Sequence, residues 1–111
     1  MNWIQLTDLG QLNEIIDQST QKAVVIFKHS TRCSVSRMAL RQFEKEYDIS
    51  EQKAIAYFLD LLNFRDISNE IATKFSVVHQ SPQVILIENG KATYSDTHSD
   101  IDAEVLKNKI N

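Results

Sequence analysis

Three runs of apolar, β-forming residues constrain the fold of this chain more than any other feature. They cover residues 23–27, 54–59 and 84–87, and each has the length of a strand that is buried on both faces. Apolar residues at helical spacing fill the intervals, over residues 34–47 and 64–75. Strands that alternate with helices imply parallel pairing, so we expect the three buried strands to run parallel.

Weaker signals extend this pattern toward both ends of the chain. Residues 3–6 can form a short edge strand, and apolar residues at helical spacing follow over residues 9–16. Asn89 and Gly90 form a strong hairpin signal, so a return strand over residues 91–95 should pair antiparallel at the edge. The predicted fold class is therefore α/β, with a mixed sheet of four to five strands and helices on both faces.

Two of the predicted helices have apolar positions that should pack on this sheet. In residues 34–47 these positions are Val35, Met38, Ala39, Phe43 and Tyr47. The last helix would be capped by Ser99 or Asp100 and would direct Val105, Leu106 and Ile110 inward.

The composition is that of a globular chain with one core. The 111 residues suit a single domain over 1–111, and 42% hydrophobic with 24% charged residues argues against disorder. No apolar run approaches the ~20 residues of a membrane span, and the N-terminus lacks the pattern of a secretory signal. A net charge of −3 gives no reason to expect nucleic-acid binding. The chain has one cysteine and cannot form an internal disulfide, so we expect it in the reducing cytoplasm. We also expect a monomer.

Charge is concentrated around this cysteine. Residues 28–45 carry five basic side chains and one acidic one, a net charge of +4 that leaves −7 for the rest. Cys33 lies in this segment, just after a buried strand and at the predicted start of a helix. A helix N-terminus and the neighbouring Arg32 and Arg37 favour the thiolate form. Cys33 is thus a candidate nucleophile, although a lone cysteine can also be a buried structural thiol.

A serine stands where a second redox cysteine would stand. The motif reads Cys33-Ser34-Val35-Ser36, so Ser36 takes the last place of a Cys-x-x-Cys pair. A serine cannot attack a mixed disulfide. Any exchange at Cys33 must stop at the mixed disulfide until an outside thiol resolves it, and this suits transfer of a small thiol.

Pro82 and the histidines are further candidates. Pro82, the only proline, stands at the start of a predicted buried strand, where a proline is tolerated. His29 could be a base or hydrogen-bond partner near the thiol, and His79 lies just before Ser81 and Pro82; a structural role remains open for both. His98 fits a loop or cap. Three scattered histidines do not predict a metal site.

The chain resembles the monothiol bacilliredoxins, thioredoxin-like proteins of the bacillithiol system. The matching stretches are Lys28-His29-Ser30-Thr31-Arg32-Cys33 with Ser36, then His79-Gln80-Ser81-Pro82-Gln83, Asn89-Gly90 and Thr97-His98-Ser99. The resemblance implies a thioredoxin-like fold with a cis bond before Pro82, and a backbone at Ser81 that pairs with substrate. The family motif usually reads Cys-Pro-Ile-Ser, so Ser34 departs from it by restoring a backbone N–H and a hydroxyl beside the sulfur.

The resemblance also implies a reaction. Cys33 would take bacillithiol from S-thiolated client proteins, and a second bacillithiol or a partner reductase would release it. Bacillithiol would be a co-substrate, with no permanently bound cofactor. Thr31, Ser34 and Ser36 would line the thiol site, and Arg32 and Arg37 would receive the carboxylates of its malate part.

Two other functions stay open. A monothiol glutaredoxin would exchange glutathione; the chain lacks the Cys-Gly-Phe-Ser motif and glycine pair of the members that share an iron–sulfur cluster. A thioredoxin-like adaptor, or a stress-induced sensor thiolated at Cys33, would not turn over a thiolated client.

Overall fold

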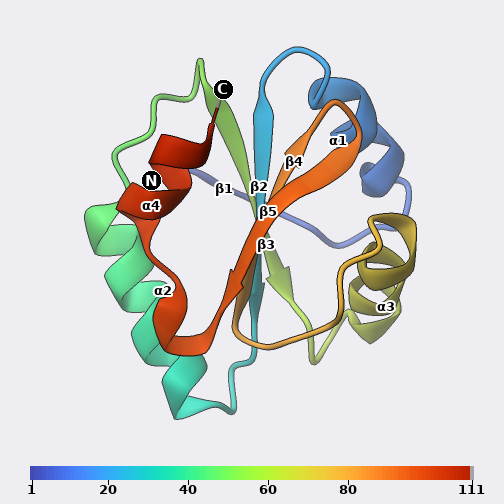
Figure 1. The fold of residues 1–111 in the computed structure, drawn as a ribbon. Helices are drawn as coiled ribbons and strands as arrows, with labels where there is room; N and C mark the ends of the chain where they lie inside the picture. The colour runs from blue at the N-terminus through green and yellow to red at the C-terminus, as the bar shows by residue number, and fades with distance from the viewer. Residues whose placement is uncertain (111) are drawn as a thin grey trace.

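A computed structural model describes residues 1–110 as a five-stranded mixed sheet between two layers of helices (Figure 1). The elements are β1 (Trp3–Gln5), α1 (Gln11–Gln18), β2 (Ala23–His29), α2 (Ser34–Glu46), β3 (Ala54–Asp60), α3 (Arg65–Lys74), β4 (Gln83–Glu88), β5 (Lys91–Thr97), the 3-10 turn η1 (His98–Asp100) and α4 (Ala103–Lys109). The strand order is β1-β3-β2-β4-β5, so β2, the strand that precedes Cys33, lies in the centre. The predicted fold class is confirmed.

The expectation that all three buried strands run parallel is wrong for β4. Strands β1, β3 and β2 are parallel, but β4 pairs antiparallel with β2, and β5 pairs antiparallel with β4. The reason is that α3 and the segment after it bring the chain back to the end of the sheet that it had left. Gln83, the first residue of β4, therefore lies opposite Lys28, near the end of β2.

Two hydrophobic clusters pack on opposite faces of the sheet because successive strand residues point to opposite sides. One cluster joins β2 residues Val24 and Ile26 to α1 and α3, and the other joins Val25 and Phe27 to α2 and α4. All four of these side chains are fully buried. Strand β2 thus has no solvent-facing side, and any polar residue on it must find partners inside the protein.

The apolar face predicted for α2 is only partly correct. Phe43 is buried, and Ala39 and Tyr47 pack at the margin of the core. Val35 and Met38 instead leave 45% and 73% of their surface exposed, close to the Cys33 end of the helix. The physical reason is that α2 is covered on one side by the sheet and on the adjoining side only by the short segment that includes η1 and α4.

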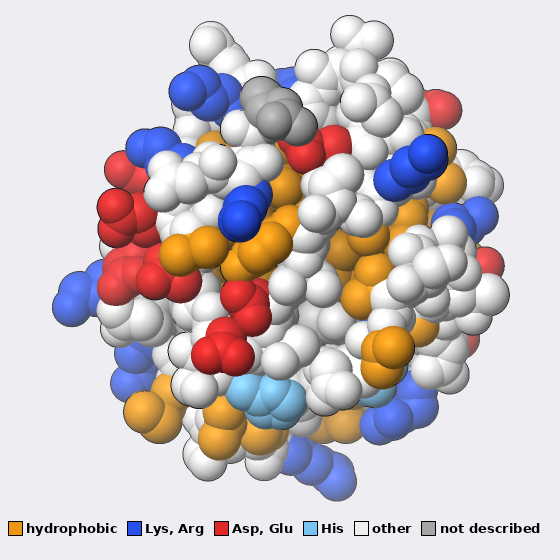
Figure 2. Space-filling view, viewed as in Figure 1, with side chains coloured by type: hydrophobic (Ala, Val, Ile, Leu, Met, Phe, Trp, Pro, Cys, Tyr) orange, Lys and Arg blue, Asp and Glu red, His pale blue; other side chains and the backbone are white. Residues whose placement is uncertain are grey.

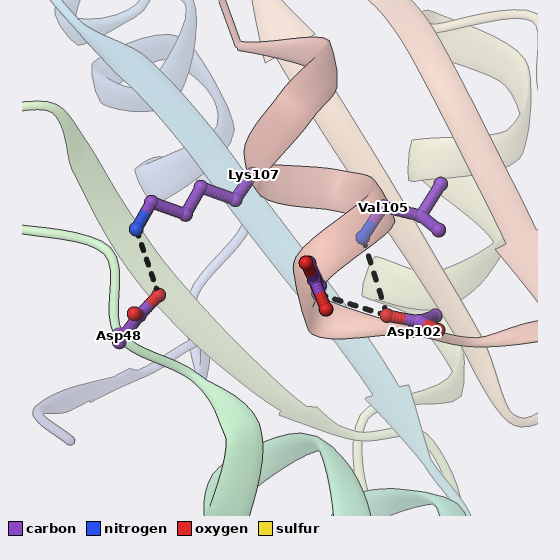
Figure 3. A network of polar contacts seen from close by, with 5 residues as sticks. Asp48, Asp102, Val105 and Lys107 are labelled. Carbon is purple, nitrogen blue, oxygen red and sulfur yellow. Dashed lines mark hydrogen bonds and ion pairs between the residues drawn. The ribbon is translucent and has the colours of Figure 1, made fainter.

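The last helix begins later than expected. Asp102, rather than Ser99 or Asp100, caps α4, because its Oδ1 accepts hydrogen bonds from the backbone N–H groups of Glu104 and Val105 (Figure 3). Val105 is 40% exposed instead of inward-facing, and Leu106 takes the buried position.

An ion pair connects α4 to the loop that follows α2. Lys107 Nζ lies 3.1 Å from Asp48 Oδ1 (Figure 3). On the face of the molecule that carries α4 and β5, acidic and basic side chains are intermixed around apolar ones (Figure 2). No helix within residues 1–110 has both the length and the apolar character needed to cross a membrane.

Candidate active site around Cys33

The cysteine occupies the residue that precedes the first turn of α2. Cys33 is the N-cap, with extended backbone angles, and its carbonyl accepts the first helical hydrogen bond from Arg37 N–H at 3.1 Å. The turn before it is closed by the Cys33 N–H, which donates to the Ser30 carbonyl at 3.2 Å. The thiol is free and its residue partly exposed. The sulfur thus combines access from solvent with the positive end of a 13-residue helix.

Ser36 lies beneath this turn rather than on the surface. Its side chain is fully buried, and its Oγ accepts a hydrogen bond from Ser30 N–H at 3.0 Å. The same Oγ is 2.8 Å from His29 Nδ1, so the hydroxyl proton is available to this nitrogen. Both contacts of the Ser36 hydroxyl are thus inside the protein. Through the bond to Ser30 N–H, Ser36 holds the turn of residues 30–33 that carries Cys33.

The structure favours a structural role for His29. Its side chain is 5% exposed, bonded to Ser36 and packed against the Phe58 ring at 5.5 Å between centroids. Burial lowers the pKa of His29, with Asp60 opposing this shift and Arg37 adding to it. A neutral imidazole that accepts the Ser36 proton fits these contacts.

The basic and polar residues around Cys33 form an exposed rim. Arg32, Arg37, Thr31 and Ser34 are all solvent-exposed. Arg37 reaches back over the turn, where its Nη1 donates to the Thr31 carbonyl at 3.0 Å. This contact joins the first turn of α2 to the turn that precedes Cys33.

The sheet brings Ser81 and Pro82 to the same end of the molecule as Cys33. The register of Lys28 with Gln83 places the start of β4 beside the end of β2. The peptide bond between Ser81 and Pro82 is cis, and the Pro82 carbonyl accepts a hydrogen bond from His98 N–H at 3.1 Å. His98 is exposed and begins η1, so it is a loop residue as expected.

Sequence reasoning missed a polar cluster beneath this end of the sheet. Lys28, counted there with the basic segment, is fully buried. Its Nζ donates to the Ser68 carbonyl at 3.1 Å and lies 3.3 Å from His79 Nδ1. The one available signal was the place of Lys28 directly after a run of buried β-formers. Because Lys28 is buried, the exposed surface of residues 28–45 carries less positive charge than the net +4 counted from the sequence.

Sequence reasoning also missed an apolar groove beside the cysteine end of α2. Val35 and Met38 line it on one side and Ile101 on the other, around a volume of about 420 Å³. Within residues 1–110, no group of three or more His, Cys, Asp or Glu side chains could hold a metal ion.

Comparison with known proteins identifies the family and the fold. The family model for the monothiol bacilliredoxin BrxC matches residues 4–106. The chain belongs to this family. A solved structure described as a candidate oxidoreductase with a thioredoxin fold is 33% identical, covers 95% of this chain and 90% of its own, and gives a TM-score of 0.80.

Thioredoxins share the fold at lower identity. The Malassezia sympodialis thioredoxin is 22% identical over 98% of this chain and 88% of its own, with a TM-score of 0.72. The Fasciola hepatica thioredoxin is 19% identical over 96% and 94%, with a TM-score of 0.67. Family and fold together support a thioredoxin-like redox enzyme of the thiol oxidoreductase class.

Proposed function

We propose that this protein is a monothiol bacilliredoxin that removes bacillithiol from S-bacillithiolated proteins through a mixed disulfide at Cys33. One observation carries the proposal: the accessible thiol stands at the N-cap of α2, while the second redox position holds a buried serine. Because the Ser36 hydroxyl is committed to His29 and Ser30, nothing at that position can resolve a disulfide. The exchanged group must therefore leave by attack of an external thiol.

The reaction is a pair of thiol–disulfide exchanges. The Cys33 thiolate attacks the bacillithiol sulfur of the client's mixed disulfide, an S–S bond forms, and the client leaves as a thiolate that takes up a proton. A second bacillithiol, as thiolate, then attacks the bacillithiol sulfur on Cys33. This step yields bacillithiol disulfide and regenerates the Cys33 thiolate, so electrons balance with bacillithiol as reductant. A partner reductase can replace the second thiol.

The surrounding residues have distinct parts in this proposal. The N-terminal end of α2 stabilises the thiolate and the leaving thiolate of each step. Arg32 and Arg37 attract the carboxylates of bacillithiol, with Thr31 and Ser34 on the same rim. The backbone of Ser81 pairs with the bound disulfide across from Cys33. The proposal needs no resident cofactor, and it places a monomeric protein in a reducing compartment such as the cytoplasm.

Selective exchange tests the proposal. Reduced protein is mixed with the oxidised forms of bacillithiol, glutathione and coenzyme A at equal concentration near neutral pH, and intact mass is followed with time. Fast, selective addition of bacillithiol is expected, with none in Cys33→Ser. Preference for glutathione would instead support glutaredoxin-like exchange, and slow addition of all three would contradict a tuned site.

Turnover separates an enzyme from a sensor. A protein carrying bacillithiol on one cysteine is incubated with catalytic amounts of wild type or Cys33→Ser, with free bacillithiol as reductant. Release of many client molecules per wild-type molecule is expected. Addition of one bacillithiol to Cys33 without further client release would identify a thiolation sensor.

A further inference from the structure

The cluster around Lys28 is the strongest feature that the proposed reaction does not use. Lys28 has no exposed surface, and among residues 1–110 it has no acidic partner in ion-pair range. Its contacts are the Ser68 carbonyl on α3 and His79 Nδ1 on the segment that leads to Ser81. A buried ammonium without a counter-charge destabilises the folded state. The hydrogen bonds of Lys28 to the Ser68 carbonyl and to His79 Nδ1 are what offset this cost.

The chemistry of the contact fixes the state of the imidazole. An ammonium group can only donate hydrogen bonds, so His79 Nδ1 must accept from Lys28 and must be unprotonated. Burial lowers the pKa of His79, and the charges of Lys28 and Arg65 lower it further. Burial also lowers the pKa of Lys28 to about 8, which leaves the lysine mostly protonated at neutral pH. The pair is therefore a charged lysine and a neutral histidine.

The second ring nitrogen of His79, Nε2, is not used in the contact with Lys28. Because Nδ1 of the neutral ring accepts from the buried lysine, its one N–H lies on Nε2, and His79 is a solvent-exposed residue. His79 stands two residues before Ser81. The position of this segment is fixed from within by Gln83, whose side chain is 1% exposed and bonds to Val78 O and Gln80 N.

We propose that Lys28 is a positioning residue that holds His79 as the Nε2–H tautomer, so that His79 donates a hydrogen bond to the thiolated substrate beside Ser81. The part that concerns the substrate rests on the proposed function. The part that concerns the tautomer rests only on the contacts of the free protein. The acceptor on the substrate is an oxygen, either of a carbonyl or of a carboxylate, on the small thiol molecule that is exchanged.

Nitrogen NMR of the imidazoles tests the tautomer directly. Two-bond proton–nitrogen spectra are recorded of the folded protein at neutral pH. The His79 signals are those that disappear in His79→Ala, and they should show Nδ1 unprotonated and Nε2 protonated. In Lys28→Met the His79 pKa should rise and the tautomer should become mixed. Ser68→Ala is the matched control, because the Ser68 hydroxyl is also 3.3 Å from His79 Nδ1. It should leave the tautomer unchanged.

Three results would overturn the assignment of Lys28. These are a wild-type His79 protonated at Nδ1, an unchanged tautomer in Lys28→Met, or a loss of the tautomer in Ser68→Ala that equals the loss in Lys28→Met. The first needs only the wild-type protein, so it can refute the assignment even if a variant fails to fold.

Exchange kinetics test the role toward substrate. Loss of one hydrogen bond should lower kcat/KM for a bacillithiol mixed disulfide about 10-fold in His79→Ala, and by a smaller factor in Lys28→Met, where part of the His79 population keeps the Nε2–H. The double variant should be no slower than His79→Ala, because Lys28 acts only through the donor that His79→Ala already removes. Multiplied losses, or full activity in His79→Ala, would refute the role. If wild type fails to exchange bacillithiol, the substrate role falls with the proposed function, while the NMR result still decides the role of Lys28.

Discussion

Replacement of Lys28 by methionine should change the pH dependence of stability in a way that burial alone dictates. Burial lowers the pKa of Lys28 from 10.5 to about 8. At about 1.4 kcal/mol per pKa unit, this difference corresponds to about 3 kcal/mol by which the charged lysine destabilises the folded state. Methionine has a similar length and no charge, so it removes this destabilisation.

The sign follows from which state holds the proton. Between pH 8 and 10.5 the folded protein gives up the Lys28 proton, while the unfolded chain keeps it. The unfolded state then binds more protons, so the free energy of unfolding of the wild type rises with pH across this window. Lys28→Met lacks this rise, and its stability relative to wild type should fall by about 3 kcal/mol between about pH 7.5 and 10.5.

The absolute difference at neutral pH should be smaller than this. Methionine removes the lysine donor from the Ser68 carbonyl, which keeps its helical hydrogen bond within α3, and from His79 Nδ1; a buried group left unsatisfied costs about 1–3 kcal/mol, the upper limit for each loss. The exposed His79 can turn to water, whereas the Ser68 carbonyl cannot. We therefore expect Lys28→Met to be about as stable as wild type or slightly more stable at about pH 7.5.

Urea unfolding at about pH 7.5, 9 and 10 measures the effect, with Lys74→Met as control for removal of an exposed lysine. Burial also raises the pKa of Tyr47 and Tyr94 to about 12, and tyrosine ionisation in the unfolded state destabilises every variant alike at high pH. This tyrosine contribution cancels when the free energies of unfolding of two variants are subtracted at the same pH. Parallel pH profiles for wild type and Lys28→Met would refute the argument that a charged lysine is buried on β2.

Three further substitutions test separate parts of the structure. Ser36→Ala should lower the free energy of unfolding by about 1–3 kcal/mol, measured in urea, because His29 and the Ser30 N–H lose their buried partner; an unchanged value would contradict the contact. Arg37→Ala should slow exchange with bacillithiol more than with an uncharged thiol, and equal slowing in stopped-flow assays would leave this arginine no role in carboxylate recognition. Asp102→Ala should cost about 1 kcal/mol through loss of the α4 cap, seen as a lower melting temperature; no decrease would show that the cap is dispensable.

Local pattern was sufficient to predict the parts of the fold that are encoded locally. The buried strands follow from runs of β-formers, and the hairpin from Asn89 and Gly90, whose positive φ angles of 51° and 75° suit these two residues. Cys33 was placed at the start of α2 because a polar break separates a strand from a helical stripe. Each of these features depends on residues within a few positions of each other.

Features that depend on distant residues could not be predicted in this way. The direction of β4 depends on the path of α3 and its following segment, and alternation of strands and helices does not reveal it. The exposure of Val35 and Met38 depends on how little of α2 the segment around Ile101 covers. The partner of Lys28 is His79, 51 positions later, so only the folded sheet shows that this lysine is buried.

The end of β2 explains how one strand can position both halves of the site. Lys28 and His29 are consecutive, so their side chains point to opposite faces of the sheet. His29 contacts Ser36 on the α2 side and thereby fixes the turn that carries Cys33. Lys28 contacts His79 on the α3 side, on the segment that carries Ser81 and Pro82. The Cys33 turn and the segment of Ser81 and Pro82 belong to different parts of the chain. Each is held to β2 by a polar contact of a buried side chain, so both are positioned relative to the same strand. Substitution of either residue should therefore disturb its own side of the site while leaving the other side in place.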